Sequence, residues 1–220
     1  MEEINLKKDQ PESQRERSKA KRRAAIIEVA TQTFLENGYE ATTMTAIAQR
    51  MGGSKGTLWS YFTTKDELLA AVIDYLSSAF QLFMGMILDT EQDMVVTLTK
   101  FCETFIERIS RPEAIALQRM VLSQADRSPH VARIFHERGP AVNHRMVANF
   151  LGRQMLAGVI PVDSPEEAAR MLLDLCTAGY HDMVFYGFQT QDTALEKEQA
   201  ARVVKQFMRC YGPAELSKGV

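Results

Sequence analysis

Hydroxyl, ammonium and glycine residues are concentrated in one short stretch of this 220-residue chain, between positions 52 and 65. Such side chains donate hydrogen bonds to phosphate oxygens and base edges, and glycine lets a backbone approach a ligand closely. The candidates in the stretch are Ser54, Lys55, Gly56, Thr57, Ser60 and Tyr61. Thr43 and Lys65 stand at predicted helix starts, where free backbone N–H groups suit a phosphate. The pattern predicts contact with a nucleic acid.

Two very short helices must position these side chains. Apolar spacing predicts them at Met44–Met51 and Lys55–Tyr61. In the turn between them, Gly52 can take a positive φ angle and Ser54 can cap the second helix. Helices this short are marginal alone, so we expect them to pack on a preceding helix at Ser18–Asn37. The apolar side chains available for this packing are Ile47, Ala48, Leu58 and Phe62 on one side and Ile27, Ala30 and Phe34 on the other. The arrangement is a helix-turn-helix unit.

Residues 24–69 resemble the N-terminal domain of tetracycline-repressor (TetR)-type regulators. The positions that carry the likeness are Phe34, Gly38, Tyr39, Thr42, Thr43, Ile47, Ala48, Gly52, Ser54, Gly56, Thr57, Leu58, Trp59, Tyr61, Phe62, Lys65 and Leu68. The resemblance implies a dimer that binds a palindromic double-stranded DNA operator, with the second short helix in the major groove. The DNA-binding residues that it implies are Thr43, Thr45, Ser54, Lys55, Gly56, Thr57, Trp59, Ser60, Tyr61 and Lys65.

Two positions depart from the family pattern. Gly53 stands where an apolar residue is usual, which predicts a looser turn. Trp59 replaces the commoner tyrosine, so the contact of that hydroxyl is lost or becomes an indole N–H contact.

Charge divides the chain into two parts. The net charge is −2, but residues 15–65 hold nine basic and four acidic residues, which leaves 17 basic and 24 acidic residues elsewhere. The basic run Arg15–Arg23 is available for an extra backbone or minor-groove contact, although such runs are often only solvated. We expect a basic and polar flexible arm at 1–17, a DNA-binding domain at 18–68 and an effector-binding and dimerisation domain at 69–220.

Composition excludes several classes of protein. The chain is 45% apolar and rich in helical spacing, while strand signatures are almost absent, so the predicted fold is all-α. Three widely spaced cysteines, Cys102, Cys176 and Cys210, indicate reduced thiols. No signal peptide is visible, and no stretch approaches the roughly 18 apolar residues of a membrane span. We therefore expect a cytoplasmic protein with no membrane partner and no cofactor.

Residues that start or interrupt helices divide the remainder of the chain into predicted helices. Thr64 and Ser164 each precede a glutamate by three residues, the pattern of a capping box. Gly139-Pro140 should kink or split one long helix, because proline lacks a backbone donor. The predicted helices are Lys65–Leu88, Met94–Ser110, Pro112–Gln124, Pro129–Ala157, Pro165–Tyr186 and Thr193–Tyr211.

A pocket for a small molecule is expected between the helices of the second domain. The candidate apolar lining is Phe101, Phe105, Met120, Phe150, Met155 and Cys176, and the candidate polar anchors are Gln118, Asn143, His144 and Tyr180. For the apolar residues an ordinary core position is the competing interpretation, because Met and Phe at helical spacing usually pack inside.

Dimerisation is expected to use the last two predicted helices, as a four-helix seam across a two-fold axis. The candidate seam residues are Leu172, Leu175, Ala178, Gly179, Met183, Val203 and Phe207. The alternative, which carries equal weight, is that these residues face the core of their own chain.

No catalytic or metal constellation stands out. His136 and His144 are eight residues apart, too far for one metal ion, and His130 and His181 have no partner pattern. The predicted function is therefore a ligand-responsive DNA-binding repressor that a small lipophilic effector releases from its palindromic operator, with Lys65–Leu88 as the lever between its domains. A helical protein that sequesters a lipophilic small molecule, with a vestigial DNA module, is the alternative, and an enzyme is a weaker one.

Overall fold

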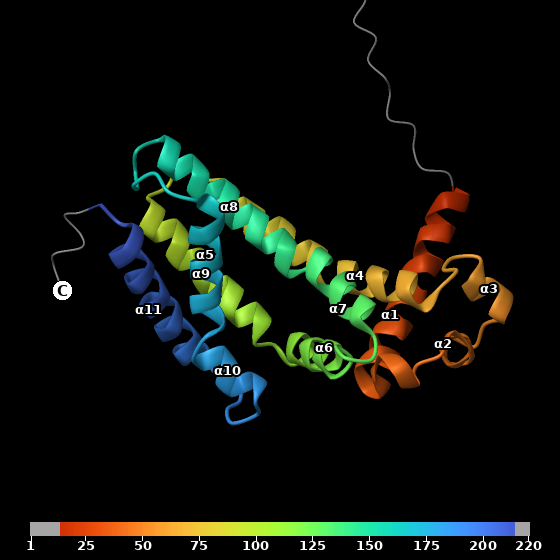
Figure 1. Ribbon diagram of the computed structural model, residues 1–220. Coiled ribbons are helices and arrows are strands. Elements are labelled where there is room, and N and C mark those ends of the chain that lie inside the picture. Colours follow the sequence, from red (N-terminus) through yellow and green to blue (C-terminus); the bar gives the residue numbers. More distant parts are fainter. Residues whose placement is uncertain (1–13, 214–220) are drawn as a thin grey trace, which may run out of the picture.

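The computed structural model describes residues 14–213, which fold as helices and connecting turns without any β-strand (Figure 1). The helices are α1 (Gln14–Ala41), α2 (Met44–Arg50), α3 (Lys55–Trp59), α4 (Lys65–Leu88), α5 (Met94–Ile109), α6 (Pro112–Ser123), α7 (Pro129–Arg138), α8 (Pro140–Leu156), α9 (Pro165–Thr177), α10 (Tyr180–Phe185) and α11 (Thr193–Tyr211). The first three helices form one end of an elongated molecule, and a bundle of α5, α8, α9 and α11 forms the other (Figure 1). The all-α prediction is confirmed.

Side-chain caps fix where several helices begin. Thr43 Oγ1 accepts from the Ala46 N–H at 3.1 Å, and Ser54 Oγ accepts from the Thr57 N–H at 3.2 Å. Thr64 caps α4 in the same way, as predicted. Each of these bonds satisfies a backbone donor that the first turn of a helix leaves without an internal partner.

Several helix boundaries differ from the sequence prediction, and two of these differences change the expected organisation. The first helix begins at Gln14, so Arg15 and Arg17 of the expected flexible arm are helical, and residues 1–13 of that arm lie outside the described residues. The predicted helix Pro165–Tyr186 is broken after Thr177, because Gly179 has a φ angle of 78° and starts the separate helix α10. The predicted interruption at Gly139 is confirmed, since it separates α7 from α8.

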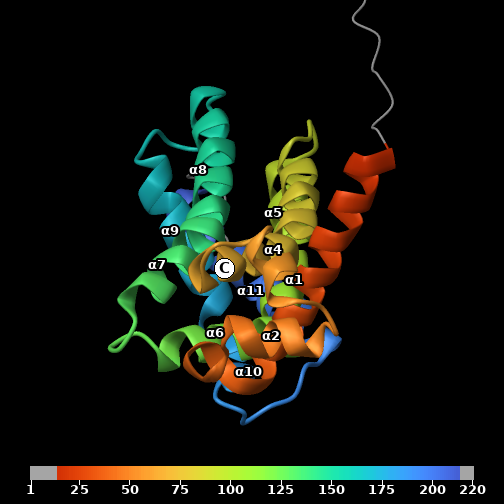
Figure 2. The same ribbon diagram turned by 90° about the vertical axis from the view of Figure 1, so that its right-hand side faces the viewer.

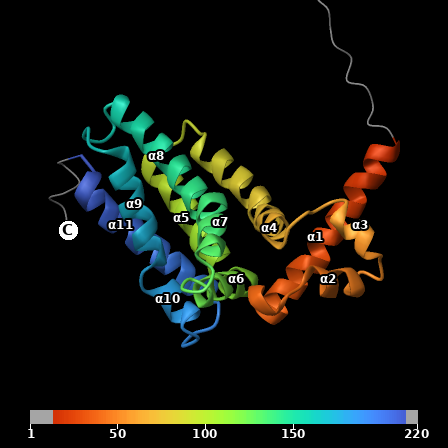
Figure 3. The same cartoon turned by 45° about the vertical axis from the view of Figure 1, so that its right-hand side comes forward.

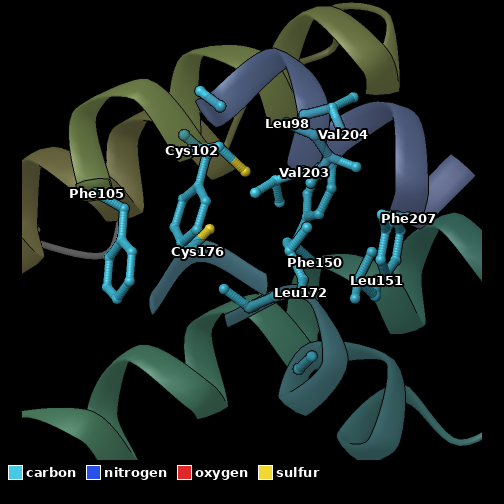
Figure 4. Close-up of a cluster of buried hydrophobic side chains, with 14 of the residues drawn as sticks. Leu98, Cys102, Phe105, Phe150, Leu151, Leu172, Cys176, Val203, Val204 and Phe207 are labelled. Atoms are coloured by element: carbon cyan, nitrogen blue, oxygen red, sulfur yellow. The ribbon is translucent and has the colours of Figure 1, made fainter. Parts of the chain in front are cut away.

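Two buried clusters hold the molecule together. The DNA-side core packs α1 to α4 around Phe34, Leu58 and Phe62 and also takes Leu117, Met120 and Val121 from α6 and Val131 from α7. The bundle core packs α5, α8, α9 and α11 around residues that Figure 4 shows, among them Phe150, Leu172 and Phe207.

Helix α4 takes part in both clusters. Leu68, Leu69 and Ile73 lie in the DNA-side core, and Met84 and Leu88 lie in the bundle core. Helix α4 packs against α1, α5 and α8, and Figure 2, which views the molecule from the DNA-side end, shows α4 beside α1 and α5. A rigid helix shared by two cores is able to carry a displacement from one to the other.

The expectation that no stretch matches a membrane span is wrong in one respect. Helix α4 is long and apolar enough to cross a membrane by length and composition, with a mean hydropathy of 1.5 over 18 residues. A helix of a protein core passes the same test, and both ends of α4 are packed in the two clusters. The packing at these ends accounts for part of the apolar character of α4, while Leu82, Phe83 and Met86 in its C-terminal half are exposed.

Candidate DNA interface and effector cavity

The turn between α2 and α3 is tight. Gly52 has a φ angle of 62°, a conformation that L side chains rarely adopt. The Gly53 N–H donates to the Ala48 carbonyl at 3.3 Å, and a Cβ at this position would lie 3.3 Å from Arg22 Nη2. Gly53 therefore leaves room for the Arg22 guanidinium beside the turn. This backbone hydrogen bond closes the turn, and the looser turn expected from Gly53 stays a prediction.

Helix α3 presents a polar face and buries one anchor. Leu58 is fully buried in the DNA-side core, while Lys55, Gly56 and Ser60 are exposed and Trp59 is 40% exposed. The hydroxyl of Thr57 lies 3.0 Å from that of Ser54. Both hydroxyls therefore start in a local pair, and DNA contact by either one requires this pair to accept a further partner. Ser54 is exposed as well, while Thr57 is partly buried.

The candidate DNA-binding residues outside α3 differ in their exposure and in the contacts that they already make. Thr43 is exposed beyond its capping role, and Thr45 and Tyr61 are partly buried. Lys65 Nζ donates to the Tyr39 carbonyl at 2.9 Å and lies 4.0 Å from the centre of the Tyr39 ring. An ammonium group has three donors, so Lys65 keeps two N–H groups for a phosphate oxygen while the first anchors the residue.

The basic run Arg15–Arg23 forms the exposed beginning of α1. Its last member, Arg23, places its guanidinium carbon 5.0 Å from the centre of the Phe62 ring, and Arg22 lies beside Gly53. The run is thus attached to the helix-turn-helix unit at its C-terminal end. Arg50 of α2 is paired with Glu36 and contributes less free positive charge.

A cavity of about 620 Å³ lies between the two cores. This volume is in the range of small-molecule sites. The lining comprises Ile73, Leu76, Ser77, Phe80, Phe105, Arg108, Ile109, Glu113, Ala114, Leu117, Gln118, Phe135, His136, Gly139, Pro140, Ala141, Asn143, His144, Arg145, Arg170, Leu173, Asp174, Thr177 and His181. Leu117 and Ile73 belong at the same time to the DNA-side core, so one side chain on each of α4 and α6 touches both the cavity and the core under α1.

The sequence prediction of the lining was correct for some residues only. Phe105, Gln118, Asn143 and His144 line the cavity. The other predicted lining residues do not: Phe101, Phe150, Met155 and Cys176 are buried in the bundle core, Met120 lies in the DNA-side core, and Tyr180 lies outside the lining. These residues fill space between helices instead of facing the cavity.

Tyr180 has a structural partner set of its own. Its hydroxyl accepts from the Asp192 N–H at 2.6 Å and lies 3.5 Å from Glu196 Oε1. Tyr180 therefore fastens the turn before α11 instead of offering a hydroxyl to a ligand.

The sequence reasoning missed a buried histidine network at the end of the cavity. His181 Nε2 lies 3.3 Å from Gln118 Oε1, and its Nδ1 lies 3.4 Å from the Ser110 hydroxyl. Burial lowers the pKa of His181, which favours the neutral ring. The network joins α5, α6 and α10. The sequence alone does not reveal this network, because His181 is far from Ser110 and Gln118 along the chain.

The dimer prediction needs correction for three residues. Leu172, Val203 and Phe207 are fully buried in the core of their own chain, so they are not available to a partner (Figure 4). Leu175 is partly buried, while Gly179 and Met183 are exposed. The three buried residues therefore face the core of their own chain, which was the alternative interpretation, because the apolar stripe of each helix packs within the bundle.

A helix-turn-helix unit with an exposed polar helix, joined to a helical bundle that borders a cavity, defines a DNA-binding transcriptional regulator. Residues 26–72 match the family model described as bacterial regulatory proteins of the tetR family, and residues 96–213 match that of the C-terminal domain of AefR-like transcriptional repressors. The chain therefore belongs to the TetR family of transcriptional regulators, as its sequence resemblance implied.

Relatives and solved structures agree with this assignment. The HTH-type transcriptional regulator UidR of Escherichia coli is 26% identical over 159 residues, which cover 70% of this chain and 76% of that protein. A putative TetR-family regulator from Mesorhizobium loti superposes with a TM-score of 0.77 at 26% identity, covering 88% of this chain and 98% of its own. The flavonoid-responsive regulator FrrA gives a TM-score of 0.75 at 27% identity, with coverage of 89% and 99%.

Proposed function

We propose that this protein is a dimeric repressor that leaves a palindromic operator when a small molecule enters the cavity of its bundle. Helix α3 would lie in the major groove, and Thr43, Tyr61 and Lys65 would hold phosphates. The observation that carries the proposal is the position of Leu117 and Ile73, which line the cavity and pack in the DNA-side core. A ligand that displaces them moves the support of α1.

Helix α6 is the second element of this coupling. It lies between the C-terminal end of α1 and α10 (Figure 3). Arg119 of α6 donates from Nε to the Phe185 carbonyl at 2.9 Å, and Gln118 meets His181 of α10. The same helix sends Met120 and Val121 into the DNA-side core. A change at the cavity therefore has a continuous packed route to the DNA-binding end.

In a dimer, release of the operator would follow from a change in the spacing of the two recognition helices. Two recognition helices must match successive major grooves, about 34–36 Å apart, and a shift in either domain disturbs this spacing. An effector that binds the mismatched conformation better draws the population away from the operator.

The outer faces of α9 and α11 are the proposed dimer surface. Met171, Leu175 and Ala178 line a shallow groove on α9, and Ala201 is exposed on α11. Leu175→Arg should convert the dimer to monomers in analytical ultracentrifugation. Leu156→Arg, at a position 90% exposed on α8, is the control that should leave the dimer intact.

The proposal is tested by selecting duplexes from a random library with the purified protein. The expected result is enrichment of a palindrome, which Lys55→Ala weakens and the remote Lys197→Ala on α11 does not. Retention of DNA with no enriched sequence, or enrichment that ignores Lys55→Ala, would argue against α3 as the reading helix.

A further inference from the structure

Arg108 is the unusual residue of the cavity wall. It is partly buried on α5 and donates from Nη2 to the Leu76 carbonyl of α4. Its guanidinium carbon lies 5.9 Å from the centre of the Phe80 ring. Among residues 14–213 no carboxylate forms an ion pair with it within 4.0 Å. A guanidinium has five N–H donors, so most of its capacity to bind an anion is unused.

Burial leaves this charge poorly compensated. Desolvation lowers the pKa of Arg108, and the neighbouring Arg111 lowers it further, while Glu113 and Glu107 act in the opposite direction at a distance. Arginine stays protonated at neutral pH, so the cost of burial falls on an unpaired cation. An anion supplied from outside would remove that cost.

The surroundings of Arg108 describe the rest of the ligand. Phe80 and Phe105 form one wall, with their ring centres 6.3 Å apart, and Phe135 and Leu173 also line the cavity. Aromatic side chains favour aromatic partners through stacked and edge-on contacts. The apolar part of a ligand that fits this wall is therefore a ring system.

The other charges of the lining do not cancel this preference. Arg145 and Arg170 add two cations, and Glu113 and Asp174 add two anions, so with Arg108 the lining carries one excess positive charge. A cationic ligand would meet repulsion from Arg108, and a neutral one would leave the guanidinium without an anionic partner. An anionic ligand relieves both.

We infer that the effector is an aromatic carboxylic acid whose carboxylate pairs with Arg108 and whose ring lies against Phe80 and Phe105. The inference rests on the proposed function, because it names the ligand class for the same cavity. Arg108 also holds the Leu76 carbonyl of α4. A carboxylate held by the free donors of Arg108 would lie beside this link to the helix that joins the two cores.

The test uses matched probes. Benzoate, 4-phenylbutanoate, 2-naphthoate and biphenyl-4-carboxylate are compared with their primary amides, which have similar shape and no charge. Thermal shift of the full chain at neutral pH and about 1 mM probe reports binding, because a ligand of the folded state raises Tm. At least one acid should raise Tm and bind about tenfold more tightly than its amide, as expected for a charge-assisted pair.

Variants assign this selectivity to Arg108. Arg108→Gln should abolish the difference between acid and amide, and Arg108→Lys should keep part of it. Arg127→Gln, an exposed arginine outside the lining, is the control that should keep it whole. If Arg108→Gln does not fold, the acid–amide difference in the unaltered protein and in Arg108→Lys still decides. Amides that bind as tightly as acids, or no shift with any probe, would overturn the inference.

DNA release is measured separately with the selected duplex. Acids that bind without releasing DNA would leave the ligand class standing and contradict the proposed function. Release of DNA by the neutral amides alone would support the proposed function and contradict the inferred ligand class.

Discussion

Arg119 Nε donates a hydrogen bond to the Phe185 carbonyl at 2.9 Å, which ties the middle of α6 to the end of α10. The bond satisfies a carbonyl that a helix C-terminus leaves open, and Arg119 Nη2 adds a bond at 3.2 Å to the Val184 carbonyl, which also accepts from the Gly187 N–H at 3.0 Å. The guanidinium carbon also lies 5.8 Å from the Phe185 ring centre. Removing this side chain frees α6 on the side opposite the DNA-side core.

We expect Arg119→Ala to lower Tm by about 2–4 °C, which corresponds to roughly 1 kcal/mol in a chain of this size. Arg127→Ala removes an exposed arginine just beyond α6 and should change Tm little. Differential scanning calorimetry makes the comparison. Equal effects of both substitutions would mean that the tie between α6 and α10 is energetically unimportant.

The turn of the DNA-binding unit should be sensitive to a single methyl group. Gly52→Ala places a side chain at a φ angle of 62° and should cost about 1–2 kcal/mol. Gly85→Ala lies inside α4, where a Cβ meets no atom within 4 Å, and should stabilise by about 0.5–1 kcal/mol. Urea unfolding of both variants tests the opposite signs. A stabilising Gly52→Ala would contradict the assigned backbone conformation.

Lys65 should act on DNA affinity without reading sequence. Lys65→Ala removes one phosphate contact, so binding to all duplexes should weaken by similar factors, and the salt slope of log Kd should fall by about 1. Lys205→Ala, exposed on α11, should leave the slope unchanged. Because Lys65 also contacts Tyr39, Tm is recorded for each variant. Loss confined to one base position of the operator would refute a phosphate role.

Because of His181, the stability of the folded protein should decrease as the pH is lowered. Its folded-state pKa is lowered by burial, so the unfolded chain takes up the proton first as pH falls, and stability is lost below about pH 6.5. Tm should therefore drop between about pH 7.5 and 5.5, and His181→Gln should flatten the drop. His136→Gln, at an exposed position, is the control. An equally steep drop in His181→Gln would exclude this histidine as its source.

The three cysteines should differ in reactivity. Cys102 and Cys176 are fully buried in the bundle core, and the neighbouring Cys176 thiol together with burial raises the pKa of Cys102 (Figure 4). Cys210 is exposed. Since the thiolate is the reactive form, a thiol reagent should modify one cysteine rapidly in the folded protein and all three after unfolding. Cys210→Ser should remove the rapid phase. Rapid modification of more than one thiol would contradict the packing of the bundle core.

The DNA-binding end was predictable from sequence because its constraints are local. Gly52, Ser54 and Leu58 fix a turn, a cap and a buried anchor within seven residues, and each has one obvious structural use. Thr64 likewise announces the start of α4.

The bundle was less predictable because its helices have apolar stripes with several possible partners. Phe207 and Leu172 fit a dimer seam and a core equally well by spacing, and only the three-dimensional packing places them in the core. Arg108 has the opposite difficulty, since a charged residue on an amphipathic helix ordinarily faces water. Its place in the cavity wall depends on α4, α8 and α9, which are distant in sequence.

The proposed repressor depends on DNA binding by α3 at base edges and by Thr43, Tyr61 and Lys65 at phosphates. Fluorescence anisotropy of the selected palindromic duplex, measured between about 50 and 200 mM salt, tests it most directly. We expect Kd to rise steeply with salt and a scrambled duplex to bind much more weakly at every salt concentration. An affinity that does not change with salt, or equal affinity for the scrambled duplex, would contradict it.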